Sequence, residues 1–188
     1  RLVGSEMCIR DRDWMDETYK NAAPSYTVNF NIAQRTKKAG YYLSGEYYRQ
    51  DGMFKKGNDI YDRYNMRAKV DFQLTNWLNI SNNTSFAFRK YDKPNIDMES
   101  FFHEVNRKST LDVVRNPDGT YTKSGGAILG LLENGGRSVN DRRDFSTTFA
   151  ATIDLLKDVW QIKADATFRR DSERTRRASL PYSYKQGP

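Results

Sequence analysis

The sequence predicts an all-β fold, an antiparallel transmembrane β-barrel fragment in which about six strands of a larger barrel make an open curved sheet. Three observations lead to this prediction. Apolar and polar residues alternate strictly over 62–88, the alternating segments exceed the usual strand length of about 5–6 residues, and the connections between them are short and long in turn. The length of 188 residues is enough for one domain.

The clearest alternation runs from Asp62 to Phe88 and restarts after a short turn. Because successive side chains of a β-strand point to opposite faces, it predicts a hairpin with one apolar and one charged face. Its strands run roughly 11–13 residues, and a tilted strand crosses a bilayer with about 9–11. The residues predicted to face lipid are Tyr64, Met66, Val70, Phe72 and Leu74.

Residues 1–12 are not expected to be native. They read RLVGSEMCIRDR. When the ten residues from Leu2 to Asp11 are translated back into codons, one possible nucleotide sequence resembles the adapter of transposase-based sequencing libraries. A signal segment is the alternative, but the stretch has no apolar core and contains acidic residues. We therefore expect the native chain to start near Asp13, which would make Cys8 foreign to it.

The strands before this hairpin are predicted from weaker patterns. Residues 13–24 form a polar lead-in, and alternation begins at Ser25. A turn rich in Lys and Gly at 36–40 leads to a second strand over 41–49, which has Tyr on both faces, and a Gly-containing loop at 50–61 follows.

A long extracellular loop is predicted at about 89–142, because this segment has Pro and Gly pairs and no sustained alternation. A short helix is expected within it, at 101–114. Two further strands, over 145–155 and 160–168, complete the set. Trp77 and Trp160 lie at the short-turn ends of hairpins, where an interfacial aromatic girdle is expected; ordinary packing at a sheet end is the alternative.

Charge and hydropathy exclude some classes of protein. The mean hydropathy of −0.87 and the lack of any run of about 18 apolar residues argue against a helical membrane protein. A barrel has apolar residues at alternate positions only, so an average does not detect it. The net charge of +7 would suggest nucleic acid, but Lys and Arg are interspersed with Asp and Glu along the strands. We expect no nucleic-acid partner.

No catalytic residue, metal ligand or cofactor is predicted, and the chain is not expected to be an enzyme. A single His, His103, and a single Cys give no cluster of metal ligands. Asp97, Glu99 and Glu104 lack the spacing of an EF-hand loop, and the Gly-Gly pairs of the long loop lack the Lys and Ser or Thr of a phosphate loop.

Four segments resemble the barrel portion of the SusC/RagA-type TonB-linked outer membrane proteins of Bacteroidetes. They are YYLSGEYYRQDGMF at 41–54, DRYNMRAKVDFQLTNWLNISNNTSF at 62–86, NPDGTY at 116–121 and ENGGRS at 133–138. The Gly-Gly that often ends the first barrel strand of this family is replaced by Ala33-Gln34, a departure that concerns local turn geometry.

The resemblance implies a Gram-negative outer-membrane importer with a barrel of about 22 strands and an N-terminal plug. Its implied partners are TonB, a SusD-like surface lipoprotein, outer-membrane lipid and an oligosaccharide substrate, with a peptide as the second candidate. Residues 13–24 are then expected to follow the plug directly, and 25–188 to be part of the barrel. The plug, the TonB box and most of the barrel are expected to lie outside this fragment.

The polar faces of two strands are predicted to line the lumen and contact either the substrate or the plug. Tyr rings stack on flat groups, while carboxylate and guanidinium groups form hydrogen bonds with polar ones. The residues are Tyr42, Glu46, Tyr48, Arg67, Lys69 and Asp71. The rival interpretation is a soluble all-β binding or structural domain, which would need a second sheet over the apolar face.

Overall fold

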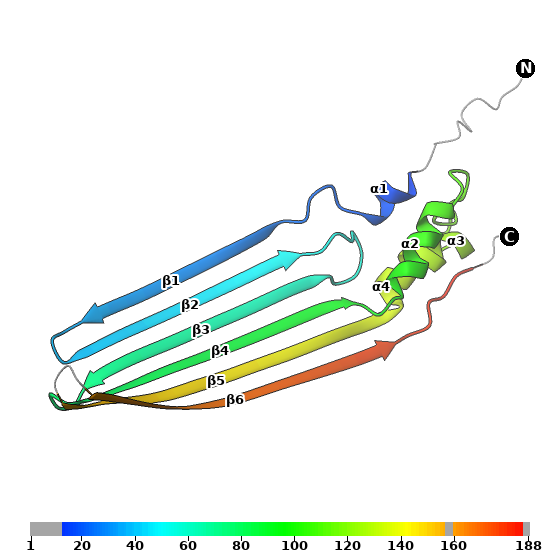
Figure 1. Cartoon of the computed structure of the whole chain (residues 1–188). Helices are drawn as coiled ribbons and strands as arrows, with labels where there is room; N and C mark the ends of the chain where they lie inside the picture. The colour runs from blue at the N-terminus through cyan, green and yellow to red at the C-terminus, as the bar shows by residue number, and fades with distance from the viewer. Residues whose placement is uncertain (1–12, 157–159, 186–188) are drawn as a thin grey trace, which may run out of the picture.

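The computed structural model describes residues 13–156 and 160–185, which form one antiparallel sheet with short helices gathered at one end (Figure 1). The strands pair in sequence order, so the prediction of an all-β sheet of about six strands is confirmed. They are β1 (Ser25–Arg35), β2 (Ala39–Asp51), β3 (Ile60–Gln73), β4 (Leu78–Pro94), β5 (Gly136–Leu156) and β6 (Trp160–Ser179). The residues predicted to derive from an adapter, 1–12, lie outside the described ranges.

The pairing register keeps the apolar parities of neighbouring strands together. Tyr64 of β3 lies opposite Tyr47 of β2 and Phe88 of β4, and Phe72 lies opposite Ile80. Because directly paired residues point to the same face, the alternation of each strand adds to one apolar and one polar surface of the whole sheet.

Three predicted boundaries need correction. β4 continues to Pro94 and β5 starts at Gly136, so the long connection spans 95–135 and not 89–142. β6 continues to Ser179, well beyond the predicted end at 168. The added strand segments carry charged or polar residues on both parities. They are held by the interstrand ladder, and hydrophobic alternation therefore does not reveal them.

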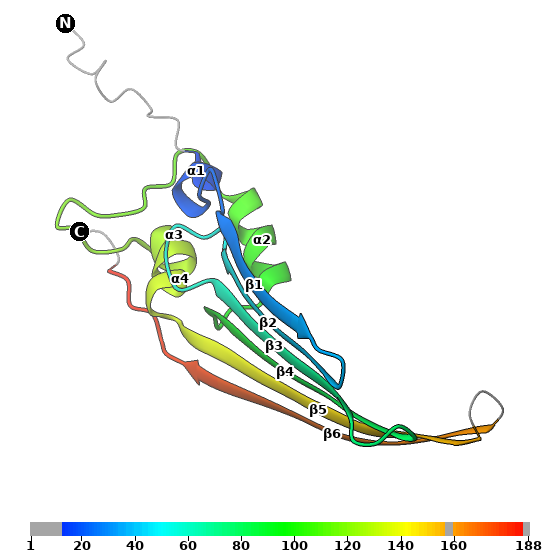
Figure 2. The same cartoon turned by 90° about the vertical axis from the view of Figure 1, so that its left-hand side faces the viewer.

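Short turns and long connections lie at opposite ends of the sheet. The turns at 36–38 and 74–77 lie at one end, and the connections at 52–59 and 95–135 lie at the other. Figure 2 shows that β5 and β6 reach past the other strands at the short-turn end. The chain enters β1 and leaves β6 at the long-connection end.

The long connections fold into a helical unit, which we call the end cap: residues 13–24, 52–59, 95–135 and 180–185. Its helices are α1 (Trp14–Thr18), α2 (Met98–Arg107), α3 (Lys123–Gly125), η1 (Gly126–Gly130) and α4 (Leu131–Asn134). The helix predicted at 101–114 is α2, and both predicted ends need correction. It starts earlier because the Asp97 side chain accepts a hydrogen bond from Ser100 N at 3.2 Å, and it ends at Arg107 because the backbone becomes extended at Lys108.

The buried core of the described residues lies in the end cap and not in the sheet. Its members are Trp14, Phe54, Phe101, Val105, Val114, Tyr121, Ile128, Leu129 and Leu132. Trp14 is 4% exposed, and its indole N–H donates to the carbonyl of Ser109 at 2.9 Å. The lead-in predicted as polar is therefore a structural anchor for the long connection.

Residues 180–185 attach to the same unit. Leu180 N donates to Gly135 O at 3.1 Å, and Lys185 N donates to Tyr121 O at 3.0 Å. The Lys185 ammonium lies 2.9 Å from the Asp118 carboxylate. Both ends of the described chain thus contact the connection between β4 and β5.

The first prediction concerns Trp14. Trp14→Ala should cost the end cap about 3–5 kcal/mol, because a buried indole and its hydrogen bond are lost. Hydrogen exchange in the full-length parent should speed up within 95–135 and stay unchanged in β2–β4. Met15→Ala is the control, because Met15 is 46% exposed. Equal exchange in both variants would contradict the anchoring role.

The second prediction concerns Asp118, whose pKa lies well below its usual value because the Thr120 hydroxyl and then Lys185 donate to it. A carboxyl group whose pKa is lower in the folded state stabilises the fold at pH values above its unfolded-state pKa of about 3.9. This stabilisation is lost as the pH falls through the folded-state pKa. Exchange protection of 180–185, corrected for intrinsic rates, should therefore fall below about pH 4. Asp118→Asn should be less protected at pH 5 and respond little to acid; equal protection at pH 5 would refute this attachment.

Candidate functional site

The polar face of the sheet holds a cavity of about 690 Å³ that is lined by residues of all six strands. This placement makes the polar face the concave one. One polar side chain from each strand illustrates the lining: Asn29, Glu46, Arg67, Arg89, Asp144 and Arg169. The site is therefore a wall built by six neighbouring strands.

Hydrogen bonds fix the carboxylate of Glu46 in this wall. It accepts from the Arg63 guanidinium at 2.6 Å and from the Asn65 amide at 3.0 Å, both on the neighbouring strand. Arg67 Nε donates to Asn83 Oδ1 at 3.0 Å, across the next strand pair. These polar groups are held in defined positions before any ligand arrives.

A second cluster in the cavity has more positive than negative groups. The Asp144 carboxylate lies 3.4 Å from Arg89 and 3.4 Å from Arg142, so two guanidinium groups share one acidic side chain. Arg169 of β6 lines the same cavity. This part of the wall can accept an anionic or strongly hydrogen-bonding group.

The predicted lumen residues all lie on this face, but not in one site. Tyr42, Glu46 and Arg67 line the cavity described above. Lys69 and Asp71, 3.9 Å apart, line another cavity of about 470 Å³ toward the short turns. Tyr48 lies toward the end cap, where the Arg63 guanidinium carbon is 5.1 Å from its ring centroid.

Sequence reasoning missed Arg89, Arg142 and Arg169. The first two fell inside the loop predicted at 89–142, and the third lies just past the predicted end of the last strand. The missed signal was parity: Arg89 continues the polar alternation of Asn83 and Ser85.

The opposite face is apolar and exposed. Tyr64, Met66 and Phe72 are each more than two-fifths exposed, and Val70 is half-buried. Leu74 follows the last residue of β3 and is 58% exposed. A continuous apolar surface of this size on a sheet marks a contact with lipid or with another protein layer.

An aromatic row closes this surface at the long-connection end. Tyr26, Tyr47, Tyr64 and Phe88 come from four adjacent strands, with ring centroids 5.7, 4.7 and 6.0 Å apart along the row. Trp77 and Trp160 lie at the short-turn end and are 52% and 64% exposed. The apolar surface thus has aromatic residues at both ends. The set at the short-turn end, Trp77 and Trp160, was predicted from the sequence, and the row at the other end was not.

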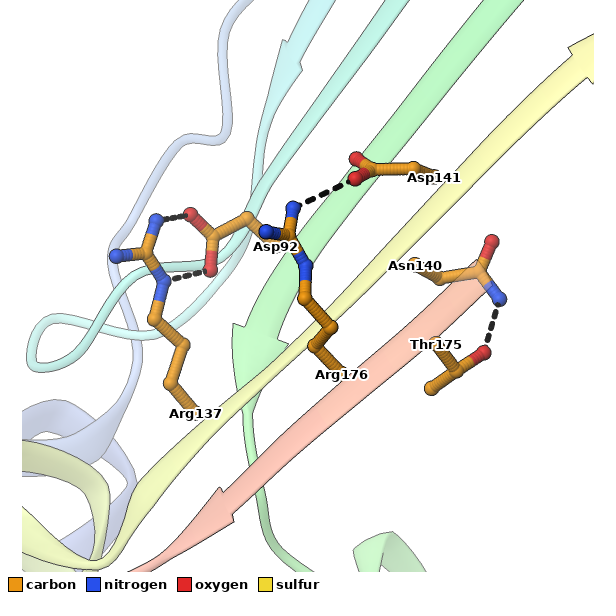
Figure 3. Close-up of polar contacts among 6 residues, drawn as sticks. All are labelled: Asp92, Arg137, Asn140, Asp141, Thr175 and Arg176. Atoms are coloured by element: carbon orange, nitrogen blue, oxygen red, sulfur yellow. Dashed lines mark hydrogen bonds and ion pairs between the residues drawn. The ribbon is translucent and has the colours of Figure 1, made fainter. Parts of the chain in front are cut away.

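Beyond the aromatic row the same face becomes ionic. Figure 3 shows the Arg137 guanidinium facing the Asp92 carboxylate, and Arg176 donating to Asp141 at 2.7 Å. On the other face Asn140 donates to Thr175 at 2.9 Å. Both faces of β5 and β6 are therefore polar here, as expected for strands that extend into water.

Asn82, Thr84 and Thr147 form a hydrogen-bonded cluster within the apolar surface. Asn82 donates to Thr147 at 3.1 Å, Thr84 donates to Asn82 at 2.9 Å, and the two threonine hydroxyls lie 2.8 Å apart. Because these groups bond to one another, they present few unpaired donors or acceptors outward.

The described residues contain no group of three or more His, Cys, Asp or Glu side chains that could hold a metal ion. Within the end cap, burial of Tyr121, followed by its hydrogen bond to Glu133, raises its pKa to about 12. The Arg115 guanidinium carbon lies 4.0 Å from the centroid of its ring. This cluster stabilises the cap and contains no activated nucleophile.

None of the described helices has the length and apolarity that a bilayer crossing requires.

Comparison with solved structures identifies a similar fold in the structure of the RagAB peptide importer in the "closed-closed" state. The TM-score is 0.71 at 20% sequence identity, and the match covers 95% of this chain. It covers 21% of the importer chain, so this chain spans about a fifth of that protein. No family model and no curated protein matches the sequence. At this identity the likeness shows the fold: an open all-β sheet of the kind found in that importer.

Proposed function

We propose that the chain is part of an outer-membrane, TonB-dependent importer of the SusC/RagA type. The observation that supports this most is the pairing of one exposed apolar face with one concave, charged face on strands long enough to cross a bilayer. The fold likeness to a chain of the RagAB importer agrees with it. The apolar face would contact lipid, and the polar face would line the lumen.

The dimensions of the apolar surface fit a bilayer. Ten residues separate Tyr64 from Leu74, which gives about 33 Å along a strand and about 25 Å across a membrane at a tilt of about 40°. The apolar band of such barrels is about 25 Å tall and is bounded by aromatic residues. Trp77 and Trp160 would form one boundary, and the Tyr64 row the other.

The long connections would face outward and the short turns the periplasm, because outer-membrane barrels have short periplasmic turns. The end cap would then be extracellular, where a SusD-like lipoprotein could contact it. In this orientation β1 runs from the outer rim toward the periplasm. If 13–24 directly follows a plug, the end of that plug must reach the outer rim.

The proposed cargo is an oligosaccharide, with a peptide as the second candidate. Tyr42, Tyr48, Glu46, Arg67, Lys69 and Asp71 would contact the cargo or the plug. The peptide alternative is supported by the likeness in fold to RagAB, which is a peptide importer. A soluble β-domain is less well supported, because no second layer covers the apolar face within 13–156 and 160–185.

The third prediction tests the function itself in the full-length parent. The protein should fractionate with the outer membrane and show slower migration after heating, as closed barrels do. Uptake of the cargo should stop when TonB is deleted and when a neighbouring SusD-like gene is deleted. Recovery of the parent in the soluble fraction would refute the proposal.

The fourth prediction tests the two faces. Val70→Lys should reduce the stability of the inserted parent by about 2–4 kcal/mol, because Val70 lies near the centre of the apolar band. Asn65→Lys, on the water-facing parity, is the matched control and should be tolerated far better. Membrane yield and denaturant midpoints of the refolded barrel provide the readout. Equal yields and midpoints for both variants would contradict the assignment of the faces.

A further inference from the structure

We propose that the end-cap side of the polar face binds the acidic group of an anionic oligosaccharide. This proposal rests on the importer function proposed above and specifies the chemical class of its cargo. The site is a cavity of about 330 Å³ lined by residues of β3–β6, and it adjoins the central cavity, with which it shares Arg89 and Arg142. Three rows of side chains build it, and each row follows the register of the sheet.

The middle row is aromatic and neutral. Tyr61 of β3 pairs with Tyr91 of β4, which pairs with Asn140 of β5. The two tyrosine ring centroids lie 6.2 Å apart in an edge-on arrangement. Aromatic rings beside an amide offer the apolar surface and the hydrogen bonds that a pyranose ring uses.

The outer row supplies two cations. Lys93 of β4 and Arg177 of β6 both pair with Ser138 of β5, so their backbones are two strand spacings, or about 10 Å, apart. The side chain between them is the short one of Ser138, which lines the cavity. The Lys93 ammonium lies 5.4 Å from the centroid of the Tyr91 ring, and among the described residues neither Lys93 nor Arg177 has a carboxylate within ion-pair distance.

The inner row does not compensate these charges. It contains Arg89 and Arg142, which share Asp144, and Glu173, whose carboxylate accepts from Asn140 at 2.7 Å. The lining of the cavity therefore has four cationic side chains and one carboxylate. A carboxylate or sulfate of the ligand would complete this charge balance at Lys93 and Arg177.

An oligosaccharide fits this site better than a peptide. Extended peptides are often recognised by main-chain pairing with an unpaired strand edge. β3, β4 and β5 are paired on both sides, and β6 is paired with β5 on the side that borders the cavity, so the floor of the cavity offers side chains and no unpaired backbone. A uronate ring can lie on Tyr61 and Tyr91 while its carboxylate reaches the two cations.

The fifth prediction is measured by titration calorimetry on the detergent-purified full-length parent, with tetragalacturonate as the probe and its methyl ester as the neutral control. The acid should bind more tightly than the ester, and added salt should weaken its binding. Lys93→Gln combined with Arg177→Gln should weaken binding of the acid roughly tenfold or more and leave the ester unchanged. Lys93→Arg with Arg177→Lys should retain binding.

Lys163→Gln is the matched control, because Lys163 lies on the same face near the short turns and should leave binding unchanged. Equal binding of acid and ester, or equal effects of the Gln pair and Lys163→Gln, would overturn the inference. The inference would also be overturned if tetraglutamate bound in a manner that depends on both cations and tetragalacturonate did not bind. Membrane location and TonB-dependent uptake are measured separately, so a transporter that fails this test refutes the ligand and leaves the transport function standing.

Discussion

The interstrand hydrogen-bond ladder is the constraint on which the rest of this structure depends. Over the residues that the structure describes, it runs from β1 to β6 with one irregularity, between Asp154 and Leu156. A slip of one residue would turn a whole strand over and place Arg67 or Lys69 among the apolar side chains. Because the register holds, one surface gathers aromatic and aliphatic groups and the other gathers charges. The cavities, the cross-strand ion pairs and the aromatic rows all follow from this register, which keeps the apolar positions of neighbouring strands on one face.

The sequence was sufficient where the two faces of a strand have different surroundings. The alternation through Tyr64, Val70 and Phe72 revealed the central hairpin, and it also assigned Arg67 and Lys69 to the opposite face. It failed where both faces are polar. In 137–144 and 169–178 charged residues occupy both parities. Ion pairs such as Asp141–Arg176 lie on the face that carries apolar side chains nearer the short turns. Periodicity in hydrophobicity carries no information about a strand with water on both sides.

The end cap was unpredictable for a different reason. Trp14 and Ser109 are joined by a hydrogen bond across 95 residues of sequence, and Phe54 comes from a third segment. Each contributing stretch is too short and too irregular to show a period of its own. Their shared core exists only after the sheet has brought the long connections to one end. The second aromatic row was missed in the same way, because Tyr26, Tyr47 and Phe88 form no pattern until the register aligns them.

The end cap includes both the segment before β1 and the segment after β6, and this is possible because the number of strands is even. Six antiparallel crossings return the chain to the end from which it started. A sheet of this kind can be gained or lost by a larger barrel without reversing the direction of any strand beside it. The hairpin is therefore the natural unit by which such walls grow over evolutionary time, and the loss of a single strand would invert everything that follows.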